Sequence, residues 1–114
     1  MSHELNKAEK KIARQLIDKG FDIECKTVLD QAAEILSEWK QNGLNNTTAY
    51  HKLFIQLQKH DKLIRYRYTE IKGSRYLSIV RAIYEDGQIT EDDIKDFSEN
   101  TRSILNKWKQ HPKD

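Results

Sequence analysis

Residues 50–71 read YHKLFIQLQKHDKLIRYRYTEI, and the spacing of their apolar side chains decides the fold. Apolar or ring-bearing residues recur at steps of three or four, at Tyr50, Leu53, Leu57, His60, Ile64, Tyr68 and Ile71. This spacing places them along one side of an α-helix and is close to the heptad pattern of helices that pack together. The preceding cluster Asn45-Asn46-Thr47-Thr48 supplies N-cap residue types, so we predict a helix from there to about Lys72.

One part of this stretch also fits a β-strand. Residues 64–69, Ile-Arg-Tyr-Arg-Tyr-Thr, alternate between apolar and polar with a period of two. The helical spacing on both sides favours the helix, and the strand stays an alternative for this short run.

A second helical stripe occupies the stretch from about Leu5 to Gln41. Its apolar residues are Leu5, Ala8, Ile12, Leu16, Phe21, Cys25, Val28, Ala32, Leu36 and Trp39. Gly20 lies in the middle, where a glycine costs about 1 kcal/mol relative to alanine. Because the stripe continues past Gly20 with little change of phase, we predict one helix, ended by Asn42 and Gly43.

Shorter helices are predicted in the C-terminal part. Apolar residues recur at helical spacing over Arg75–Asp86, and Gly87 follows as a C-cap. Thr90 and Asp93 have the spacing of a capping box. They precede a last helical stretch that carries Ile94, Phe97, Ile104, Leu105 and Trp108 and is expected to break near residues 98–100. The sequence therefore predicts an all-α fold, with a long helical hairpin and short C-terminal helices packing as a dimeric helical bundle.

The composition fits one small helical domain. The chain has 114 residues, of which 33% are charged and 37% hydrophobic. We expect a single domain over residues 1–114, with short flexible ends at about 1–4 and 110–114. No apolar run approaches the roughly 20 residues of a membrane span, and no secretory signal pattern is present. Cys25 is the only cysteine, so the expected location is the cytoplasm.

Long helices with few crossings enclose a thin core. A lone helical hairpin leaves much of its apolar surface in water, so long stripes favour packing between copies of the chain. We therefore predict a homodimer with Leu53, Leu57, Ile64 and Tyr68 at the interface.

Charge is unevenly distributed, although the formal net charge is only +2. Residues 59–81 are rich in Lys and Arg, and residues 82–102 are rich in Asp and Glu. Within the basic region, the predicted partner-binding residues are Arg65, Tyr66, Arg67 and Arg75. Guanidinium groups form forked hydrogen bonds with carboxylates or phosphates, and Tyr and Arg are favoured at protein interfaces.

Two other interpretations of the basic region stay open. The same surface could bind the phosphates and bases of a nucleic acid, although a net charge of +2 is small for that class of protein. The arginines could instead neutralise Glu85, Asp86 and the acidic residues after Thr90, within the fold or across a dimer.

No group of residues in the sequence predicts catalysis, a cofactor or a metal. No histidine has metal-ligand spacing to another His or Cys, and the usual nucleotide-binding glycine loops are missing. His60 falls on the apolar stripe and is expected in a core or interface, and Cys25 is expected to be a buried structural thiol. We therefore expect a non-enzymatic protein-interaction or regulatory module that binds its partner through the basic central helix and needs no cofactor.

Three stretches of the chain carry a family resemblance. The first is residues 8–21 together with Glu24. The second contains Leu53 and Leu57 and the Tyr-rich basic stretch that follows them. The third is Ile83–Ile89, followed by acidic residues and Ile94. In this order they resemble the fluorescence recovery protein family, small helical regulators that act on the orange carotenoid protein. The resemblance implies an all-helical dimer that works by binding a protein. When the central helices are matched on Leu53 and Leu57, the family's tryptophan falls on His51 and its following aspartate on Ile55, so the same partner is not implied.

Overall fold

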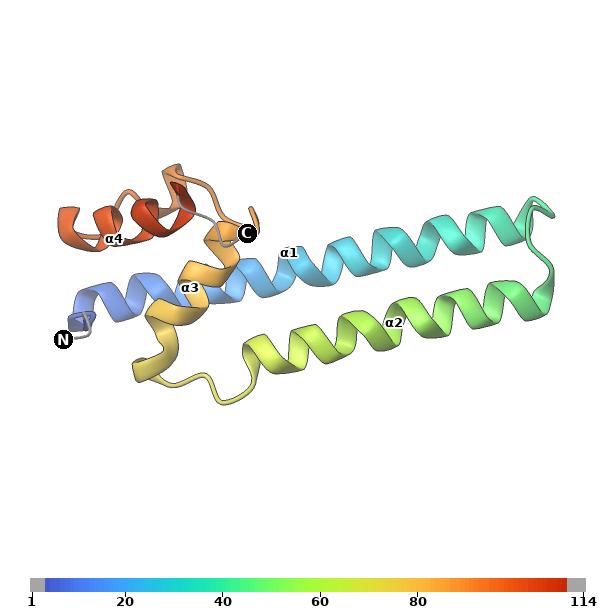
Figure 1. Cartoon of the computed structure of the whole chain (residues 1–114), viewed down its shortest axis with the longest axis horizontal. Coiled ribbons are helices and arrows are strands. Elements are labelled where there is room, and N and C mark those ends of the chain that lie inside the picture. Colours follow the sequence, from blue (N-terminus) through green and yellow to red (C-terminus); the bar gives the residue numbers. More distant parts are fainter. Residues whose placement is uncertain (1–3, 111–114) are drawn as a thin grey trace. The chain divides into compact units, whose positions relative to one another are not determined.

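The computed structural model of the chain describes residues 4–110, and every regular element in this range is helical (Figure 1). The elements are α1 (Lys7–Lys40), α2 (Asn46–Tyr68), the 3-10 turn η1 (Gly73–Arg75), α3 (Tyr76–Glu85), the 3-10 turn η2 (Asp92–Ile94) and α4 (Glu99–Gln110). The predicted all-α class is confirmed, and the strand alternative for residues 64–69 is wrong because α2 runs to Tyr68. The flexible ends expected at 1–4 and 110–114 lie outside the described residues, apart from Glu4 and Gln110.

The contacts within the chain divide it into two compact units. The hairpin unit is one continuous segment, residues 22–69. The discontinuous unit combines residues 4–21 with residues 70–110. The discontinuous unit therefore joins two separate segments of the sequence.

Gly20 lies inside α1, and the helix is continuous through it as predicted. A Cβ atom at Gly20 would lie 2.9 Å from the Cδ1 atom of Ile83, so the missing side chain lets α3 approach α1 closely. The helix ends at Lys40, and Asn42, two residues beyond it, adopts a left-handed φ of 63°. The N–H of Gly43 then donates to the Glu38 carbonyl at 2.8 Å, which satisfies a carbonyl of the last turn.

The start of α2 lies where the sequence predicts it, but its end does not. The side chain of Asn45 accepts a hydrogen bond from the Thr48 N–H at 2.8 Å, which confirms the predicted N-cap cluster. The helix ends at Tyr68 and not at the predicted Lys72. Both the N–H and the hydroxyl of Thr69 donate to the Arg65 carbonyl, and a side-chain hydrogen bond of this kind competes with the helical ladder. Ile71, the last member of the predicted stripe, consequently lies beyond the helix.

Most of the well-buried apolar side chains belong to the discontinuous unit. They include Ile17, Ile79, Val80, Ile83, Ile89, Ile94 and Leu105, each at most 2% exposed. The C-cap predicted at Gly87 is confirmed, with φ 84° and N–H groups of Gly87 and Gln88 donating to the carbonyls of Tyr84 and Ile83. This unit therefore has an apolar core of its own.

Glu9 on α1 holds the start of α4 through hydrogen bonds. Its carboxylate accepts from the N–H and hydroxyl of Ser98 at 3.1 and 3.0 Å, and from the Thr101 hydroxyl at 2.6 Å. Burial raises the pKa of Glu9, but these hydrogen bonds together with one from the Asn6 N–H bring the pKa below its ordinary value. A buried carboxylate therefore joins the first helix of the chain to the last.

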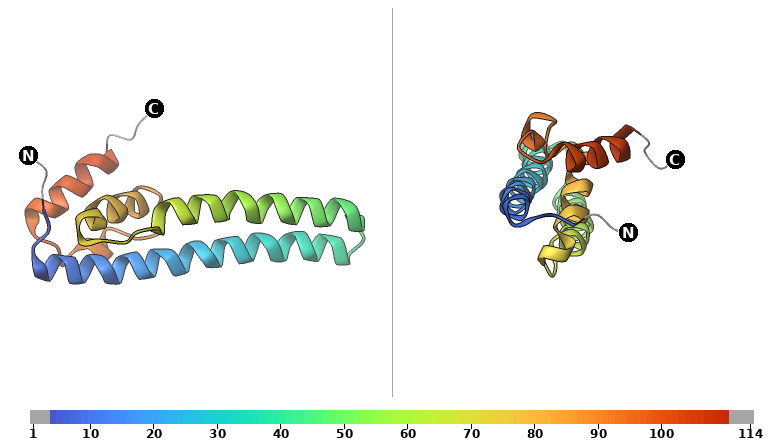
Figure 2. Two further views of the ribbon diagram at one scale, coloured as in Figure 1. Left: turned by 90° about the horizontal axis from the view of Figure 1, so that it is seen from below. Right: turned by 90° about the vertical axis from the view of Figure 1, so that its left-hand side faces the viewer.

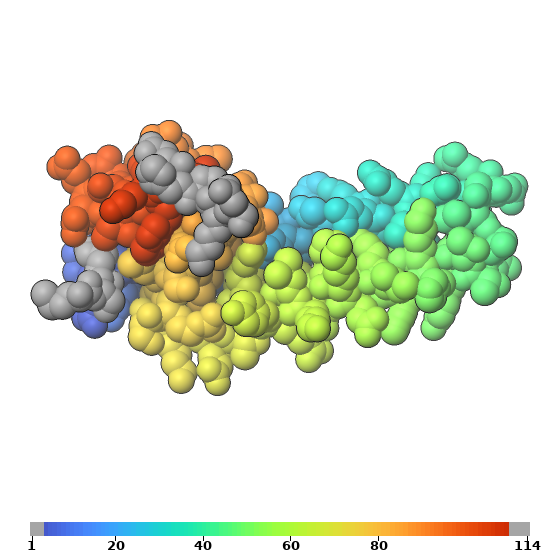
Figure 3. Space-filling view, in the orientation of Figure 1, coloured from blue at the N-terminus to red at the C-terminus, as the bar shows by residue number. Residues whose placement is uncertain are grey.

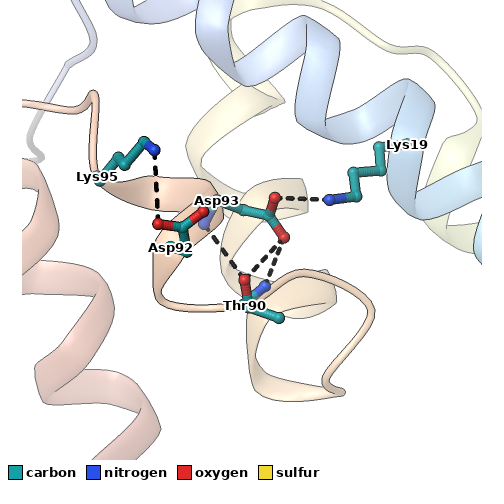
Figure 4. A network of polar contacts seen from close by, with 5 residues as sticks. All are labelled: Lys19, Thr90, Asp92, Asp93 and Lys95. Atoms are coloured by element: carbon teal, nitrogen blue, oxygen red, sulfur yellow. Dashed lines mark hydrogen bonds and ion pairs between the residues drawn. The ribbon is translucent and has the colours of Figure 1, made fainter.

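The capping box predicted at Thr90 and Asp93 is present (Figure 4). The Thr90 N–H donates to Asp93 at 2.7 Å, and the Asp93 N–H donates to the Thr90 hydroxyl at 3.3 Å. The ammonium of Lys19 on α1 also pairs with the Asp93 carboxylate at 2.6 Å. The box starts the short turn η2 rather than a long helix, and α4 begins only at Glu99.

Candidate functional site

The exposed large apolar side chains of the described residues gather on the hairpin unit. They are Leu29, Leu36, Trp39, Tyr50, Phe54, Ile55, Leu57, Leu63 and Tyr66, with Phe21 just before this segment. By contrast, the buried apolar residues of the hairpin unit are only Ala49 and Tyr68. Isolated exposed apolar residues are ordinary, but a concentration on one element marks a binding surface.

Residues 22–40 of α1 and the whole of α2 run antiparallel and side by side, as two views agree (Figures 1 and 2). Polar contacts fix this pairing along its length. The Gln56 side-chain amide donates to the Val28 carbonyl and to the Gln31 side chain, both at 3.1 Å. Near the connecting turn, the Trp39 indole N–H donates to the side chain of Asn46 at 2.7 Å. The space-filling view shows the side chains of α2 (green to yellow-green) at the surface beside those of α1 (Figure 3).

An apolar groove of about 620 Å³ follows one side of the hairpin. Its lining comes from Val28 on α1 and from Tyr50, Leu53, Phe54, Leu57, Gln58, His60, Asp61 and Ile64 on α2. Three of the four predicted dimer-interface residues, Leu53, Leu57 and Ile64, thus line one groove. His60 also lines this groove and is half-buried. Its neighbours there are mainly apolar side chains, as expected for a histidine in a core or an interface.

Tyr68, the fourth predicted interface residue, lies elsewhere. Its side chain is buried and lies beside Glu24 and Arg67. Burial, followed by the hydrogen bond and negative charge of Glu24, raises the pKa of the Tyr68 hydroxyl far above its usual range. Tyr68 is therefore not one of the exposed side chains of the hairpin unit.

Arg67 is directed inward and does not share the surface of its neighbours. Its guanidinium pairs with the Glu24 carboxylate on α1, and the two side chains are 12% and 9% exposed. Successive residues on a helix differ by about 100° in direction, so adjacent positions point to different sides. The sequence did not single out Glu24 as the partner, because residues 24 and 67 meet only when the hairpin forms.

Arg65 and Tyr66 are at the surface, as predicted. The Arg65 side chain is 78% exposed and its Nε lies 2.8 Å from Asp61, one turn earlier on α2. Tyr66 is 81% exposed, the largest value among the exposed large apolar residues. Arg75 lies in the discontinuous unit, where its guanidinium is 3.5 Å from the Glu70 carbonyl.

Within the chain, the arginines of the basic region pair with different acidic residues. Arg65 pairs with Asp61 and Arg67 with Glu24, both within the hairpin unit, so neither of these pairs uses the acidic region after residue 82. Arg81, also in the basic region, does pair with Glu85 of the acidic region at 3.1 Å, and Asp93 pairs with Lys19. Neutralisation across a dimer stays an alternative. The Arg81 guanidinium also lies 4.4 Å from the centre of the Trp108 ring.

No group of three or more His, Cys, Asp or Glu side chains within residues 4–110 is arranged to hold a metal ion. Among the described helices, none combines the length and the apolar content needed to cross a membrane.

The sequence matches no protein-family model, and comparison with curated proteins and with solved structures gives no match. Inferences about function therefore depend on the surfaces of this chain.

Proposed function

We propose that the chain is a non-enzymatic, homodimeric protein-interaction or regulatory module of the cytoplasm. The observation that carries this proposal is the apolar groove of the hairpin unit together with the exposed apolar residues around it. A layer of two helices buries only the sides that face each other, and a second layer is needed to cover an apolar face. Two hairpins paired through this face form a four-helix bundle.

A second copy is the occupant that fits an apolar groove on a hairpin. In a two-fold dimer the same face is used by both copies, so an apolar face meets an apolar face without any charge complementarity. The groove lining contains one carboxylate, Asp61, which Arg65 already neutralises. Leu53, Leu57 and Ile64 are the proposed interface residues.

The dimer is tested by comparing two like substitutions on α2. Leu57 and Leu63 are 41% and 48% exposed, but only Leu57 lines the groove. Light scattering at about 10–200 μM protein should report a dimer for the wild type and for Leu63→Asp, and a monomer for Leu57→Asp, because an unpaired buried charge is costly. Leu57→Asn serves as a milder variant if Leu57→Asp does not fold. A monomeric wild type, or Leu57→Asp dimers as tight as the wild type, contradicts the proposal.

We further propose that the partner is bound by Arg65 and Tyr66 on α2, and Arg75 in the discontinuous unit stays a predicted partner contact. Arg67 supports the hairpin in this proposal, since its guanidinium is paired with Glu24. Arg65→Ala with Tyr66→Ala should abolish capture of the partner from a lysate of the source cells and leave the melting temperature nearly unchanged. Retained capture removes this surface from consideration, and capture of nucleic acid with a steep salt dependence supports the alternative class.

A further inference from the structure

An exposed ridge of side chains lies on α2, on the side opposite the groove; we call it the outer ridge. Residues nine positions apart on a helix differ by about 180° in direction. Ile55 is opposite the groove residue Ile64, and Tyr66 is opposite the groove residue Leu57. The outer ridge consists of Ile55, Lys59, Lys62, Leu63 and Tyr66, all exposed.

The outer ridge carries positive charge that the fold leaves unneutralised. The basic residues of α2 are Lys52, Lys59, Lys62, Arg65 and Arg67, and its only acidic residue is Asp61. Asp61 pairs with Arg65, Glu24 pairs with Arg67, and Glu38 lies 3.9 Å from Lys52. Lys59 and Lys62 make no ion pair within the described residues, and both are on the outer ridge.

We propose that the outer ridge binds an acidic amphipathic helix of a partner protein. This inference rests on the proposed function and names the chemistry of the partner that α2 binds. The ridge has three exposed apolar side chains spaced by eight and three residues, Ile55, Leu63 and Tyr66, which a helix packing alongside α2 can contact. Lys59 and Lys62 lie between these side chains, where carboxylates of an acidic helix can reach them. The ridge spans eleven residue steps, about 16 Å, which matches a partner helix of three to four turns.

The same features disfavour the other classes of partner. Helices that lie on membranes bury one broad apolar face. The broad apolar face of α2 is the groove side, which the proposed dimer covers, whereas the outer ridge has only Ile55, Leu63 and Tyr66, with Lys59 and Lys62 among them. Nucleic acids bind cationic and aromatic side chains, through their phosphates and bases. Exposed aliphatic side chains such as Ile55 and Leu63 add little to that binding.

The proposal is tested with three fluorescein-labelled peptides of eighteen residues that share one amphipathic leucine pattern. Their polar positions carry only Glu, only Gln or only Lys. Fluorescence anisotropy should show the Glu peptide binding the wild-type protein at least tenfold more tightly than the Gln peptide, with no binding of the Lys peptide. Lys59→Glu with Lys62→Glu should reverse this order, and Leu63→Ser should weaken binding of the Glu peptide about tenfold.

A matched control makes the same two Lys→Glu changes at another place on the surface. Lys7 and Lys11 are exposed residues of α1 in the discontinuous unit. Lys7→Glu with Lys11→Glu should bind the Glu peptide within twofold of the wild type. The proposal is overturned if no peptide binds, if all three bind alike, or if this control loses as much affinity as the ridge variant. It is equally overturned if only phosphatidylserine-containing vesicles or a 20-base-pair DNA duplex bind.

Oligomeric state is measured on the same samples, so the two proposals fail separately. Dimers that bind none of the peptides overturn the ridge and leave the apolar interface standing. Monomers that bind the Glu peptide in the predicted order contradict the dimer and support the ridge.

Discussion

The Arg67 guanidinium on α2 is paired with the Glu24 carboxylate on α1, and both side chains are about nine-tenths buried. The pair lies in a hairpin unit whose buried apolar residues are only Ala49 and Tyr68. Removing both charges from water is expensive, and only close pairing offsets that cost. The pair therefore acts mainly by fixing which residues of the two helices lie opposite each other.

Breaking this pair on one side should destabilise the protein strongly. Glu24→Gln leaves the Arg67 charge buried without its carboxylate, and we expect a loss of about 3 kcal/mol in the free energy of unfolding. Urea denaturation at one fixed protein concentration measures the loss, because the stability of a dimer depends on concentration.

Two comparison variants separate the pair from a general effect of charge. Glu24→Leu with Arg67→Leu removes both charges and should recover most of the lost stability. Asp30→Asn removes the partner of the exposed Lys26 on α1, away from the groove, and should leave the free energy of unfolding nearly unchanged. A loss in Asp30→Asn as large as that in Glu24→Gln would contradict the assignment.

Glu9 should make the stability depend on pH. Its pKa is lowered in the folded protein, so its contribution is present above the pKa of the unfolded chain and is lost as the pH falls through the folded value. The difference in unfolding free energy between the wild type and Glu9→Gln should be largest above about pH 5 and should shrink toward pH 3. A difference that stays constant over this range would show that the carboxylate charge has no part in the contact.

Gly20 and Ile83 should be energetically coupled. Gly20→Ala gains about 1 kcal/mol of helix propensity but places a methyl group 2.9 Å from the Cδ1 of Ile83, so the two effects nearly cancel. Ile83→Val removes that Cδ1 atom. The double variant should therefore be more stable than the sum of the single changes predicts, by about 1 kcal/mol. Additive single effects would contradict the contact.

Gly87 and Asn42, two of the left-handed residues that follow helices, should respond in opposite directions. Gly87 has φ 84°, and no atom lies within 4 Å of the position that an alanine methyl group would take there. Gly87→Ala should therefore cost about 1 kcal/mol through backbone conformation alone. Asn42 has φ 63° two residues beyond the end of α1, so Asn42→Gly should be neutral or slightly stabilising. Thermal unfolding followed by circular dichroism measures both, and a destabilised Asn42→Gly would point to an unrecognised role of the asparagine side chain.

The long helices were predictable because their signal is local and repeated. The stripes of α1 and α2, the cap at Asn45 and the reciprocal bonds of Thr90 and Asp93 involve residues within a few positions of one another. The end of α2 was placed too late because the apolar spacing continues to Ile71, whereas the hydrogen bonds of Thr69 and the left-handed φ of Glu70 end the helix earlier.

The candidate site was only partly predictable for a related reason. The stripe identified Leu53, Leu57 and Ile64, which line the groove. It could not separate Arg67 from Arg65, because the difference between them is the Glu24 carboxylate on another helix. The outer ridge could not be recognised from residue types alone. Ile55 and Leu63 are aliphatic, and such residues are expected in a core unless their side chains are known to point outward. The homodimer, the partner and the resemblance to the fluorescence recovery protein family stay predictions.

The hydrogen bond from Thr101 to Glu9 affects the order in which a growing chain can acquire its structure. It joins positions 92 residues apart, whereas the hairpin unit consists of residues 22–69 alone. During synthesis the hairpin can pair as soon as α2 has left the ribosome, because local contacts close quickly. The discontinuous unit waits for α4, so its large apolar side chains stay uncovered until α4 has been made. Of the two units, the one with more fully buried apolar side chains is therefore the one that is completed later.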